Sequence, residues 1–212
     1  MKLPLRERKK VRTAQAIEKA ASELFDAQGF DATTLEQIAE VADIHKQTVL
    51  RYFKTKEDIA FAHRNRLFDD FVRGLEGRQG GVLDYWRGYI EETSKYASKT
   101  NALRKWLDFI GPDDRLYAYQ LRLNQRYQDV LADALAVEAG TDPDSDVFAH
   151  AIAAMLVGGN ADVARMTIRG GRDKDVAHNV VQVIDLAQTL RRETIPPAKP
   201  AKAARRPRPT AK

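Results

Sequence analysis

The stretch from residue 33 to residue 56, TTLEQIAEVADIHKQTVLRYFKTK, constrains the fold more than any other part of this chain. Its apolar residues recur at helical spacing over two short helices placed end to end. Two short helices that cross steeply need a small residue at their contact, which Ala39 supplies. They also need a tight turn, and Asp43 fits it because aspartate tolerates the left-handed conformation that few residues other than glycine adopt. The pattern predicts a helix-turn-helix whose apolar side consists of Leu35, Ile38, Ala39, Ala42, Ile44, Val49, Tyr52 and Phe53.

The second helix carries polar and basic side chains on the side opposite its apolar residues. Such side chains donate to phosphates and to base edges, and a helix of this kind fits the major groove of DNA. A helical hairpin in an unrelated all-α protein shows the same short pattern, so the motif alone leaves that alternative open. We expect the side chains that face DNA to be His45, Lys46, Gln47, Thr48 and Arg51.

A longer helical pattern precedes the motif and ends at Gly29. Glycine just beyond the last periodic residue is typical of a helix C-cap. Thr33 and Thr34 follow as capping residues of the next helix. The apolar face of the longer helix consists of Ile17, Ala20, Ala21, Leu24 and Phe25, and the basic residues before it are Arg6, Arg8, Lys9, Lys10 and Arg12.

The run from Arg12 to Ile59 resembles the N-terminal domain of the TetR family of transcriptional regulators. The matching pieces are RTAQAIEKAASELFDAQGFDATTLEQIAEVA and IHKQTVLRYFKTKEDI, with the Gly-Phe-x-x-Thr-Thr junction, the Tyr-Phe pair and the Lys-Glu pair at 56–57 in the order and spacing of that family. The resemblance implies an all-α protein with an N-terminal three-helix DNA-binding domain and a larger helical domain that binds a ligand and dimerises. It also implies that Thr34, Tyr52 and Lys56 lie against the DNA backbone, and we count Thr33 with them.

Three positions depart from the commonest pattern of that family. Asp43 replaces the usual glycine of the turn, which should cost some local stability. His45 replaces the usual serine, so the second helix begins with a weaker cap. Leu50 replaces a tyrosine that contacts phosphate in many members, so we expect Leu50 either to touch a thymine methyl group or to pack inside the domain.

The charge is unevenly distributed along the chain. Residues 1–12 carry a charge of +5 and residues 196–212 a charge of +6, which leaves about −6 for residues 13–195. Positive charge near the helix-turn-helix attracts the phosphate backbone of DNA, whereas the negative charge of residues 13–195 repels it from the rest of the molecule.

Composition excludes several classes of protein. The absence of cysteine excludes disulfides and cysteine metal sites. The charged N-terminus lacks the apolar core of a signal peptide, and no apolar run approaches the ~18 residues of a membrane span. We therefore expect a soluble, cytoplasmic protein without a membrane partner.

The domain organisation follows from composition and periodicity. We predict a DNA-binding domain with a basic N-terminal arm at 1–55, a connecting helix at 56–76 and a helical ligand-binding and dimerisation domain at 77–194. The remaining residues, 195–212, are predicted to be disordered because they cannot bury enough apolar surface to fold. This basic tail either sweeps nearby DNA as an arm or is a solvated tail of no consequence.

Helical patterns fill the larger domain, and no strand pattern is convincing. We place the helix starts at Asn101, at Pro112 and at either Asp144 or Ser145. The predicted helices cover 82–99, 101–110, 112–138, 145–169 and 174–192.

The last two of these helices carry apolar stripes wide enough for an intrachain core or for a partner. Gly158 and Gly159 lie mid-helix, where glycine costs about 1 kcal/mol relative to alanine, and the close approach of another helix would explain them. In TetR-like proteins these helices pair with their copies in a four-helix bundle, so the resemblance implies a homodimer. We expect its interface to include Phe148, Ile152, Gly159, Val163, Val180 and Ile184, with a plain intrachain core as the alternative.

Most of the aromatic residues lie in the central helices, as expected of a mostly apolar pocket for a small molecule. The alternative is an ordinary aromatic core. The run from Trp106 through Tyr127 resembles regulators that sense acyl-CoA-like ligands. The predicted ligand-binding residues are Trp86, Tyr89, Trp106, Phe109, Tyr127, Met155 and Asn160.

No pattern indicates catalysis, a metal or a cofactor. The four histidines lack metal-ligand spacing, and the chain contains no nucleophile elbow, phosphate loop or dinucleotide fingerprint. The acidic run at 142–146 starts like a calcium loop but has Val147 and Ala153 where that loop needs glycine and glutamate, so we interpret it as a helix-capping turn. We expect a homodimeric transcriptional repressor that leaves a near-palindromic operator when an apolar or amphipathic ligand binds. An architectural DNA-binding protein and an enzyme on a helical scaffold are the alternatives.

Overall fold

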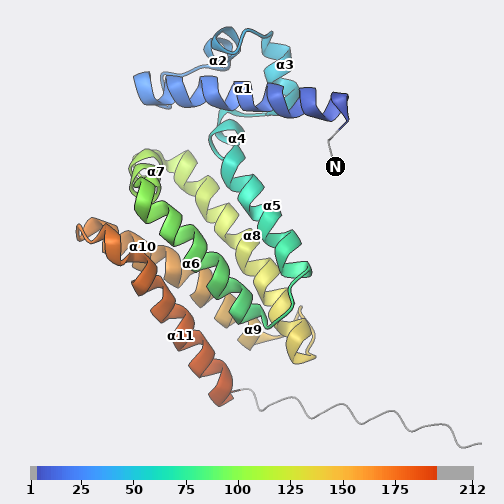
Figure 1. Cartoon of the computed structure of the whole chain (residues 1–212), viewed down its shortest axis with the longest axis vertical. Helices are drawn as coiled ribbons and strands as arrows, with labels where there is room; N and C mark the ends of the chain where they lie inside the picture. Colours follow the sequence, from blue (N-terminus) through green and yellow to red (C-terminus); the bar gives the residue numbers. More distant parts are fainter. Residues whose placement is uncertain (1–3, 195–212) are drawn as a thin grey trace, which may run out of the picture. The chain divides into compact units, whose positions relative to one another are not determined.

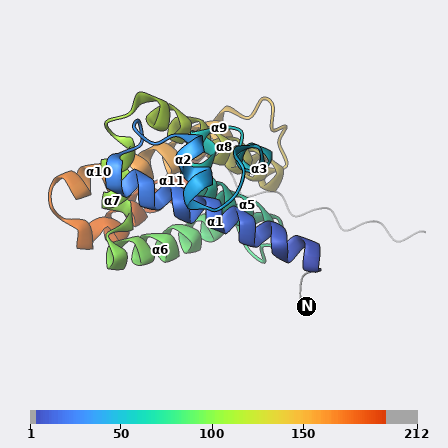
Figure 2. The same ribbon diagram turned by 90° about the horizontal axis from the view of Figure 1, so that it is seen from above.

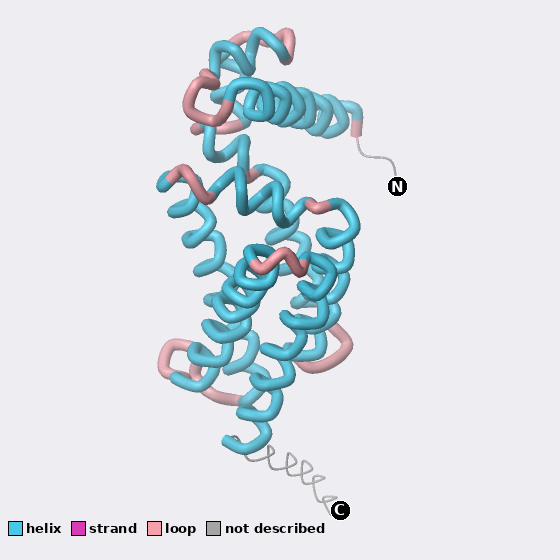
Figure 3. Tube along the Cα trace, turned by 90° about the vertical axis from the view of Figure 1, so that its left-hand side faces the viewer, coloured by secondary structure: helices cyan, strands magenta, loops and turns pink. Residues whose placement is uncertain are grey.

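A computed structural model of the chain describes residues 4–194, and every regular element in that range is a helix (Figure 3). The predicted all-α fold class is confirmed. The chain divides into two compact units. The N-terminal unit comprises the residues up to Gly77 together with Trp106–Leu123, and the C-terminal unit comprises Arg78–Lys105 and the residues from Asn124 onward. The prediction had assigned 106–123 to the larger domain, so this segment is the main difference from the predicted boundaries.

The N-terminal unit is built on one long helix, α1. Figure 1 shows α2 and α3 on the same side of α1, and Figure 2 shows α2 lying over it. The end of α7 and the beginning of α8 complete the unit. Its helices are α1 (Leu5–Gln28), α2 (Leu35–Val41), α3 (Lys46–Tyr52), α4 (Lys56–Ala60) and α5 (Ala62–Glu76), with parts of α7 (Ala102–Ile110) and α8 (Asp114–Ala139).

The core of this unit joins α1 to the helix-turn-helix, as the apolar pattern predicted. Ala39 is 4% exposed and lies where α1, α2 and α3 meet, which confirms the need for a small residue there. Gly29 ends α1 with a φ of 84°, which confirms the predicted glycine cap. The buried residues of the core are Ile17, Ala20, Ala21, Ile38, Ala39, Val49 and Ile59, and the predicted Leu35, Ala42, Ile44, Tyr52 and Phe53 pack against them.

Two helices of this unit differ from the sequence-based predictions. The basic residues from Arg6 to Arg12 belong to the first turns of α1 rather than to a separate arm. The helix predicted at 56–76 is interrupted at Phe61, which separates α4 from α5. Phe61 is fully buried, stacked on Tyr119 with ring centroids 4.2 Å apart and set edge-on to Trp106 at 4.8 Å. The helix breaks where Phe61 makes these tertiary contacts, and such contacts cannot be inferred from the local periodicity of the sequence.

The C-terminal unit is a set of packed helices in which α11 contacts both α6 and α10 (Figure 1). Ion pairs tie its elements together, including Arg87 with Asp185 at 2.5 Å and Arg191 with Glu138 at 2.9 Å. Besides the remaining parts of α7 and α8, its elements are α6 (Val82–Thr100), α9 (Val147–Ala154), the π-helical turn η1 (Met155–Gly159), α10 (Asn160–Arg169), the 3-10 turn η2 (Asp173–Asp175) and α11 (Val176–Thr194).

The starts of two helices lie slightly beyond the predicted positions. α8 begins at Asp114, and the Asp113 carboxylate accepts from the backbone N–H of Arg115 at 2.8 Å as a cap. α9 begins at Val147, capped by Asp146 rather than by Asp144 or Ser145. The short aspartate side chain bonds the free N–H groups of the first turn in both cases, which is why aspartates cluster at these starts. The interpretation of 142–146 as a capping turn is therefore confirmed.

The helix predicted at 145–169 is not a single regular α-helix. Its middle, Met155–Gly159, is π-helical. A Cβ atom on Gly159 would lie 3.0 Å from Cγ1 of Val183, a distance that real Cβ atoms rarely reach. For Gly159, the predicted close approach of a second helix is thus provided by α11 of the same chain, whereas a Cβ atom on Gly158 would meet only the Gln128 side chain, at 3.9 Å.

One expectation about hydropathy was wrong. Val147–Arg169 forms a helical stretch of 23 residues that is long and apolar enough to cross a membrane by length and composition alone. Core helices of soluble proteins also meet this criterion, and here the stretch packs against α11. The predicted disordered tail, 195–212, lies outside the described residues.

Candidate nucleic-acid interface

The helix-turn-helix is formed by α2 and α3. The Thr34 hydroxyl accepts from the backbone N–H of Gln37 at 3.2 Å, and the Gln37 side chain accepts from the backbone N–H of Thr34 at 2.8 Å. This capping box satisfies two donors that the helix N-terminus would leave unpaired. Asp43 has a φ of 53°, and the backbone N–H of Ile44 donates to the Ala39 carbonyl at 3.0 Å. The left-handed turn predicted at Asp43 is therefore confirmed.

The outer face of α3 is open to solvent, while Val49 on its inner face is completely buried and sets the rotation of the helix. Leu50 was expected either to touch a thymine methyl group or to pack inside the domain. Its side chain is 41% exposed, which excludes packing inside the domain. Of the residues predicted to face DNA, His45, Gln47 and Arg51 are exposed and Lys46, Thr48 and Tyr52 are half-buried.

His45 caps α3 with its backbone only. Its carbonyl accepts from the backbone N–H groups of Thr48 at 2.7 Å and of Val49 at 3.3 Å, and its side chain makes no capping bond. The weak cap predicted from the sequence is confirmed, and the imidazole projects from the start of the recognition helix.

The two threonines before α2 have different environments. Thr34 is exposed at the N-cap, whereas Thr33 is 1% exposed and donates through its hydroxyl to the Gly29 carbonyl at 2.8 Å. Thr33 therefore supports the loop from inside. Its predicted contact with DNA would require the loop to open.

Lys46 is paired with Glu36, which the sequence analysis did not single out. Glu36 lies in the first turn of α2 and Lys46 in the first turn of α3, and their side chains form an ion pair across the helix-turn-helix. The hydrogen bond from the Lys46 ammonium lowers the pKa of the Glu36 carboxyl below its ordinary value. The ammonium of Lys46, one of the residues predicted to face DNA, therefore already binds a carboxylate of the same domain.

Lys56 is bound to the loop between α1 and α2. Its Nζ donates to the carbonyls of Phe30 at 2.5 Å, Thr33 at 2.7 Å and Asp31 at 3.4 Å, and lies 4.3 Å from the centre of the Phe30 ring. Burial lowers the pKa of this ammonium, and the nearby Arg115 guanidinium lowers it further. Lys56 therefore has an intramolecular role in shaping the loop, and its contact with phosphate stays a prediction.

The same loop is held from its other side by the start of α8. The Arg115 guanidinium forms ion pairs with Asp31 and, at 2.7 Å, with Asp113, and it lies 5.4 Å from the centre of the Phe30 ring. The hydrogen bond from Arg115 holds the pKa of the Asp113 carboxyl below its ordinary value. Sequence reasoning missed Arg115 and Asp31 as a pair because 84 residues separate them.

The residues predicted to line a ligand pocket fall into two groups. Trp106 and Phe109 belong to the N-terminal unit, with ring centroids 5.7 Å apart. Phe109 contacts Phe25 at 5.7 Å and Phe30 at 6.0 Å, and Trp106 contacts Phe61. These two aromatic residues thus form part of the apolar packing that joins the segment 106–123 to α1 and α5.

The second group lies in the C-terminal unit. Trp86 is 3% exposed, its ring 5.8 Å from that of Tyr89 and 6.2 Å from that of Tyr127. The hydroxyls of Tyr89 and Tyr127 share a hydrogen bond of 2.9 Å. Met155 is half-buried in the π-helical turn, and Asn160 directly follows that turn.

Asn160 stands out chemically. It is 5% exposed, and neither its amide nitrogen nor its amide oxygen has a hydrogen-bond partner among the described residues. A buried amide without partners is costly and uncommon, and π-helical turns such as the one before Asn160 occur frequently at functional sites. Asn160 is therefore the member of the predicted pocket whose environment most needs a further partner.

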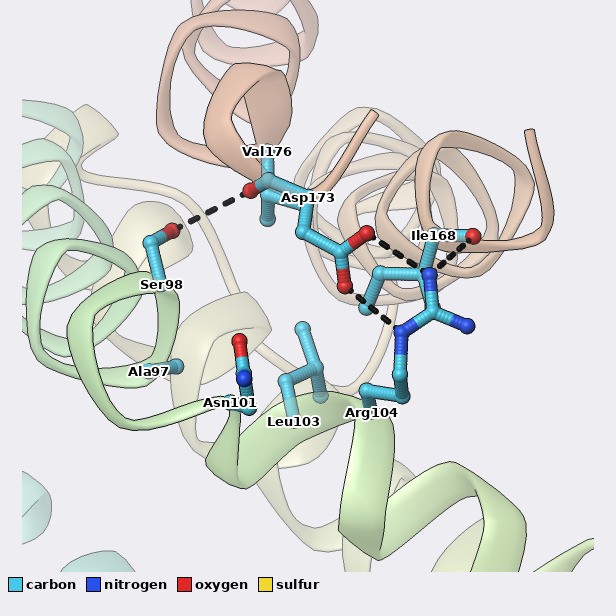
Figure 4. Close-up of a pocket in the computed structure, with 8 residues that line it drawn as sticks. All are labelled: Ala97, Ser98, Asn101, Leu103, Arg104, Ile168, Asp173 and Val176. Atoms are coloured by element: carbon cyan, nitrogen blue, oxygen red, sulfur yellow. Dashed lines mark hydrogen bonds and ion pairs between the residues drawn. The ribbon is translucent and has the colours of Figure 1, made fainter. Parts of the chain in front are cut away.

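A shallow surface cleft of about 10 Å³ lies elsewhere in the C-terminal unit, between the end of α6 and the start of α11 (Figure 4). Arg104 closes one side by donating to both carboxylate oxygens of Asp173, at 2.9 and 2.6 Å, and to the Ile168 carbonyl at 2.8 Å. The Ser98 hydroxyl donates to the Asp173 carbonyl at 3.4 Å on the other side. None of the predicted ligand residues lines this cleft.

The predicted dimer residues also divide. Ile152, Val180 and Ile184 are 7%, 3% and 0% exposed, because they pack within one protomer. Gly159 and Val163 are half-buried, and Phe148 is 51% exposed. The apolar stripe read from the sequence therefore includes both side chains buried inside the protomer and side chains exposed on its surface. Other large apolar side chains exposed there are Val147, Met166, Leu186 and Leu190.

Among residues 4–194, no group of three or more histidine, aspartate or glutamate side chains is arranged to hold a metal ion. The comparisons with known proteins agree with the geometry of α2 and α3. A sequence model described as "Bacterial regulatory proteins, tetR family" matches residues 17–62, which span the helix-turn-helix. Residues 17–62 are thus similar to the DNA-binding domain of the TetR family.

Two curated regulators are similar to parts of this chain. The HTH-type transcriptional regulator TcmR of Streptomyces glaucescens is 32% identical over 137 residues, which are 62% of this chain and 56% of TcmR. The HTH-type transcriptional regulator RutR of Escherichia coli K12 is 37% identical over 88 residues, which are 39% of this chain and 42% of RutR. The chain spans about half the length of the curated relatives it matches.

Solved structures of TetR-like regulators share the fold. The complex of SmeT with triclosan superposes with a TM-score of 0.63 at 21% identity, covering 84% of this chain and 91% of that one. The transcriptional regulator FadR from Bacillus subtilis, in complex with stearoyl-CoA, superposes with a TM-score of 0.55 at 17% identity, covering 82% and 96%. At these identities the likeness concerns the fold.

Proposed function

We propose that this protein is a sequence-specific DNA-binding transcriptional regulator that places α3 in the major groove. The observation that carries the proposal is the exposed outer face of α3, rich in polar and basic side chains, on a helix-turn-helix with a buried core. The basic first turns of α1, from Arg6 to Arg12, supply positive charge on the same unit. The TetR-family relatives are transcriptional regulators by name, and we infer that this chain is likewise a cytoplasmic regulator and not an enzyme.

Selection from a pool of random DNA duplexes tests the proposal. The full chain should enrich one sequence, and its affinity for that sequence should exceed its affinity for random DNA by about 10³ or more at a fixed salt concentration. Equal affinity for all sequences would overturn the proposal and favour the architectural alternative.

We infer further that the regulator acts as a homodimer on a near-palindromic operator. Two copies must place their recognition helices about 34–36 Å apart to reach successive major grooves on one side of DNA. Phe148, Met166 and Leu186, each more than half exposed, supply apolar surface on the last helices for such pairing. Sedimentation velocity should show a dimer, and the selected operator should contain two inverted half-sites.

We also propose that an apolar or amphipathic ligand, with acyl-CoA-like molecules as one class, binds the C-terminal unit and releases the repressor. The support is Asn160, a buried amide without a partner among the described residues, which a polar group of the ligand would satisfy. The solved complexes of SmeT with triclosan and of FadR with stearoyl-CoA show two such molecules bound to proteins of this fold. A ligand shifts the equilibrium only if it binds one conformation more tightly than the other.

Titration of the operator complex with stearoyl-CoA and, separately, with triclosan tests the ligand class. Release of DNA by either probe supports the proposal, and Asn160→Leu should blunt that release while leaving operator affinity unchanged. A variant that responds to the same probe as the wild type would show that Asn160 is not the polar anchor.

A further inference from the structure

The ion pair between Glu36 and Lys46 lies on the face that the proposed function assigns to DNA. Lys46 occupies the first turn of α3, where the positive end of the helix dipole disfavours a cation. Glu36 occupies the first turn of α2, where a carboxylate is favoured. The ion pair thus places opposite charges together at the starts of the two helices, where each charge neutralises the other.

This pair contributes little to the stability of the fold. The side chains of Lys46 and Glu36 are 43% and 62% exposed, and exposed ion pairs contribute about 0–1 kcal/mol. The ion pair instead restricts the direction of the Lys46 side chain. Without a partner, a lysine ammonium on its flexible four-carbon stem samples many directions. A bond to Glu36 restricts that range and leaves the remaining donors of the ammonium for another acceptor.

A carboxylate beside this ammonium also changes which acceptors it can reach. DNA phosphates are anions and are repelled by Glu36, whereas base edges in the major groove are neutral. The commonest specific contact of lysine is with the O6 and N7 acceptors of guanine. Glu36 thus biases Lys46 away from the backbone and toward a base.

We propose that Glu36 is a positioning residue for sequence readout, holding Lys46 toward a guanine and away from the nearest phosphate. The inference rests on the proposed function, in which α3 reads DNA. Loss of the carboxylate frees Lys46 for the backbone, so discrimination falls while binding to any sequence strengthens.

Glu36→Gln in the full-length protein tests this role on the operator selected by the wild-type chain. At the guanine whose preference Lys46→Ala abolishes, we expect Glu36→Gln to reduce discrimination by about fivefold or more. Binding to random DNA should strengthen, and the salt slope should increase by about 1 as Lys46 gains a phosphate. Glu40→Gln makes the same charge change on an exposed residue of α2 that has no ion pair among the described residues, and should leave the base preference unchanged.

The double variant separates positioning from a general charge effect. Because both changes act through one contact, Glu36→Gln combined with Lys46→Ala should discriminate no worse than Lys46→Ala alone. Additive losses, equal effects of Glu36→Gln and Glu40→Gln, or a wild-type preference in Glu36→Gln would each overturn the role of Glu36. A wild-type chain that selects no sequence would overturn the proposed function itself. Equal thermal unfolding midpoints of the variants exclude misfolding as the cause.

Discussion

Replacing Lys56 by methionine keeps most of the length of the side chain and removes its ammonium group. The structure gives that group two short hydrogen bonds, to the carbonyls of Phe30 and Thr33, and a longer one to Asp31. A hydrogen bond with a charged partner contributes about 1.5–3 kcal/mol, and the contact with the Phe30 ring about 0.5–1 kcal/mol. The partial burial of the ammonium and the access of water to the released carbonyls offset part of this sum. We expect Lys56→Met to lower the free energy of unfolding by about 2 kcal/mol.

Urea unfolding of the full chain, followed by circular dichroism, measures this loss. Lys54→Met is the matched control, because Lys54 is exposed two residues earlier and its replacement should change stability by less than about 0.5 kcal/mol. Unchanged stability in Lys56→Met, together with a salt slope of DNA binding lowered by about 1, would refute the loop-anchoring role. That result would make Lys56 the phosphate contact implied by the family resemblance.

Three further predictions follow from the caps, the loop and the last helix. Thr34→Ala removes the capping box of α2 and should cost about 1 kcal/mol of unfolding free energy in urea; no change would show that water replaces the cap. The hydrogen bond from Arg115 lowers the pKa of the Asp113 carboxyl below its ordinary value in the folded state, so its stabilising contribution is present above the pKa of the unfolded chain and is lost as the pH falls through the lower folded value. In Asp113→Asn, the thermal unfolding midpoint should therefore fall less steeply than in the wild type as the pH is lowered into the acid range. An unchanged pH dependence would contradict this. Leu186→Glu should give a folded monomer in sedimentation and circular dichroism, whereas Ile184→Glu should unfold the protomer because Ile184 is fully buried; a folded monomer from Ile184→Glu would put that residue at the interface.

The helix-turn-helix was predictable because its determinants are local. The cap at Thr34, the left-handed turn at Asp43 and the apolar spacing around Ala39 all lie within ten residues of one another, and each restricts the backbone on its own. Helix order in the rest of the chain followed from periodicity for the same reason, with errors of a few residues where aspartate caps replaced the predicted ones.

Partners far apart in the sequence were not predictable. Periodicity shows that Trp106 and Phe109 lie on an apolar face, but not that this face meets Phe25, Phe30 and Phe61. An apolar stripe likewise does not distinguish a protomer core from an interface, because both bury the same kinds of side chain. A charge pair such as Glu36 with Lys46 becomes visible only once the turn has brought two helix starts together.

The π-helical turn at Met155–Gly159 divides the long helix of the C-terminal unit into two halves with separate rotational phase. Hydrogen bonds in such a turn reach one residue further than in an α-helix, so positions beyond Asn160 are rotated relative to a continuous 3.6-residue count. Deleting one residue from the turn would restore regular winding and rotate Asn160 away from its present orientation. Relatives with a one-residue gap in this segment should therefore differ in which side chain enters the interior, so the loss of a single codon would change the inner surface of this helix without any substitution.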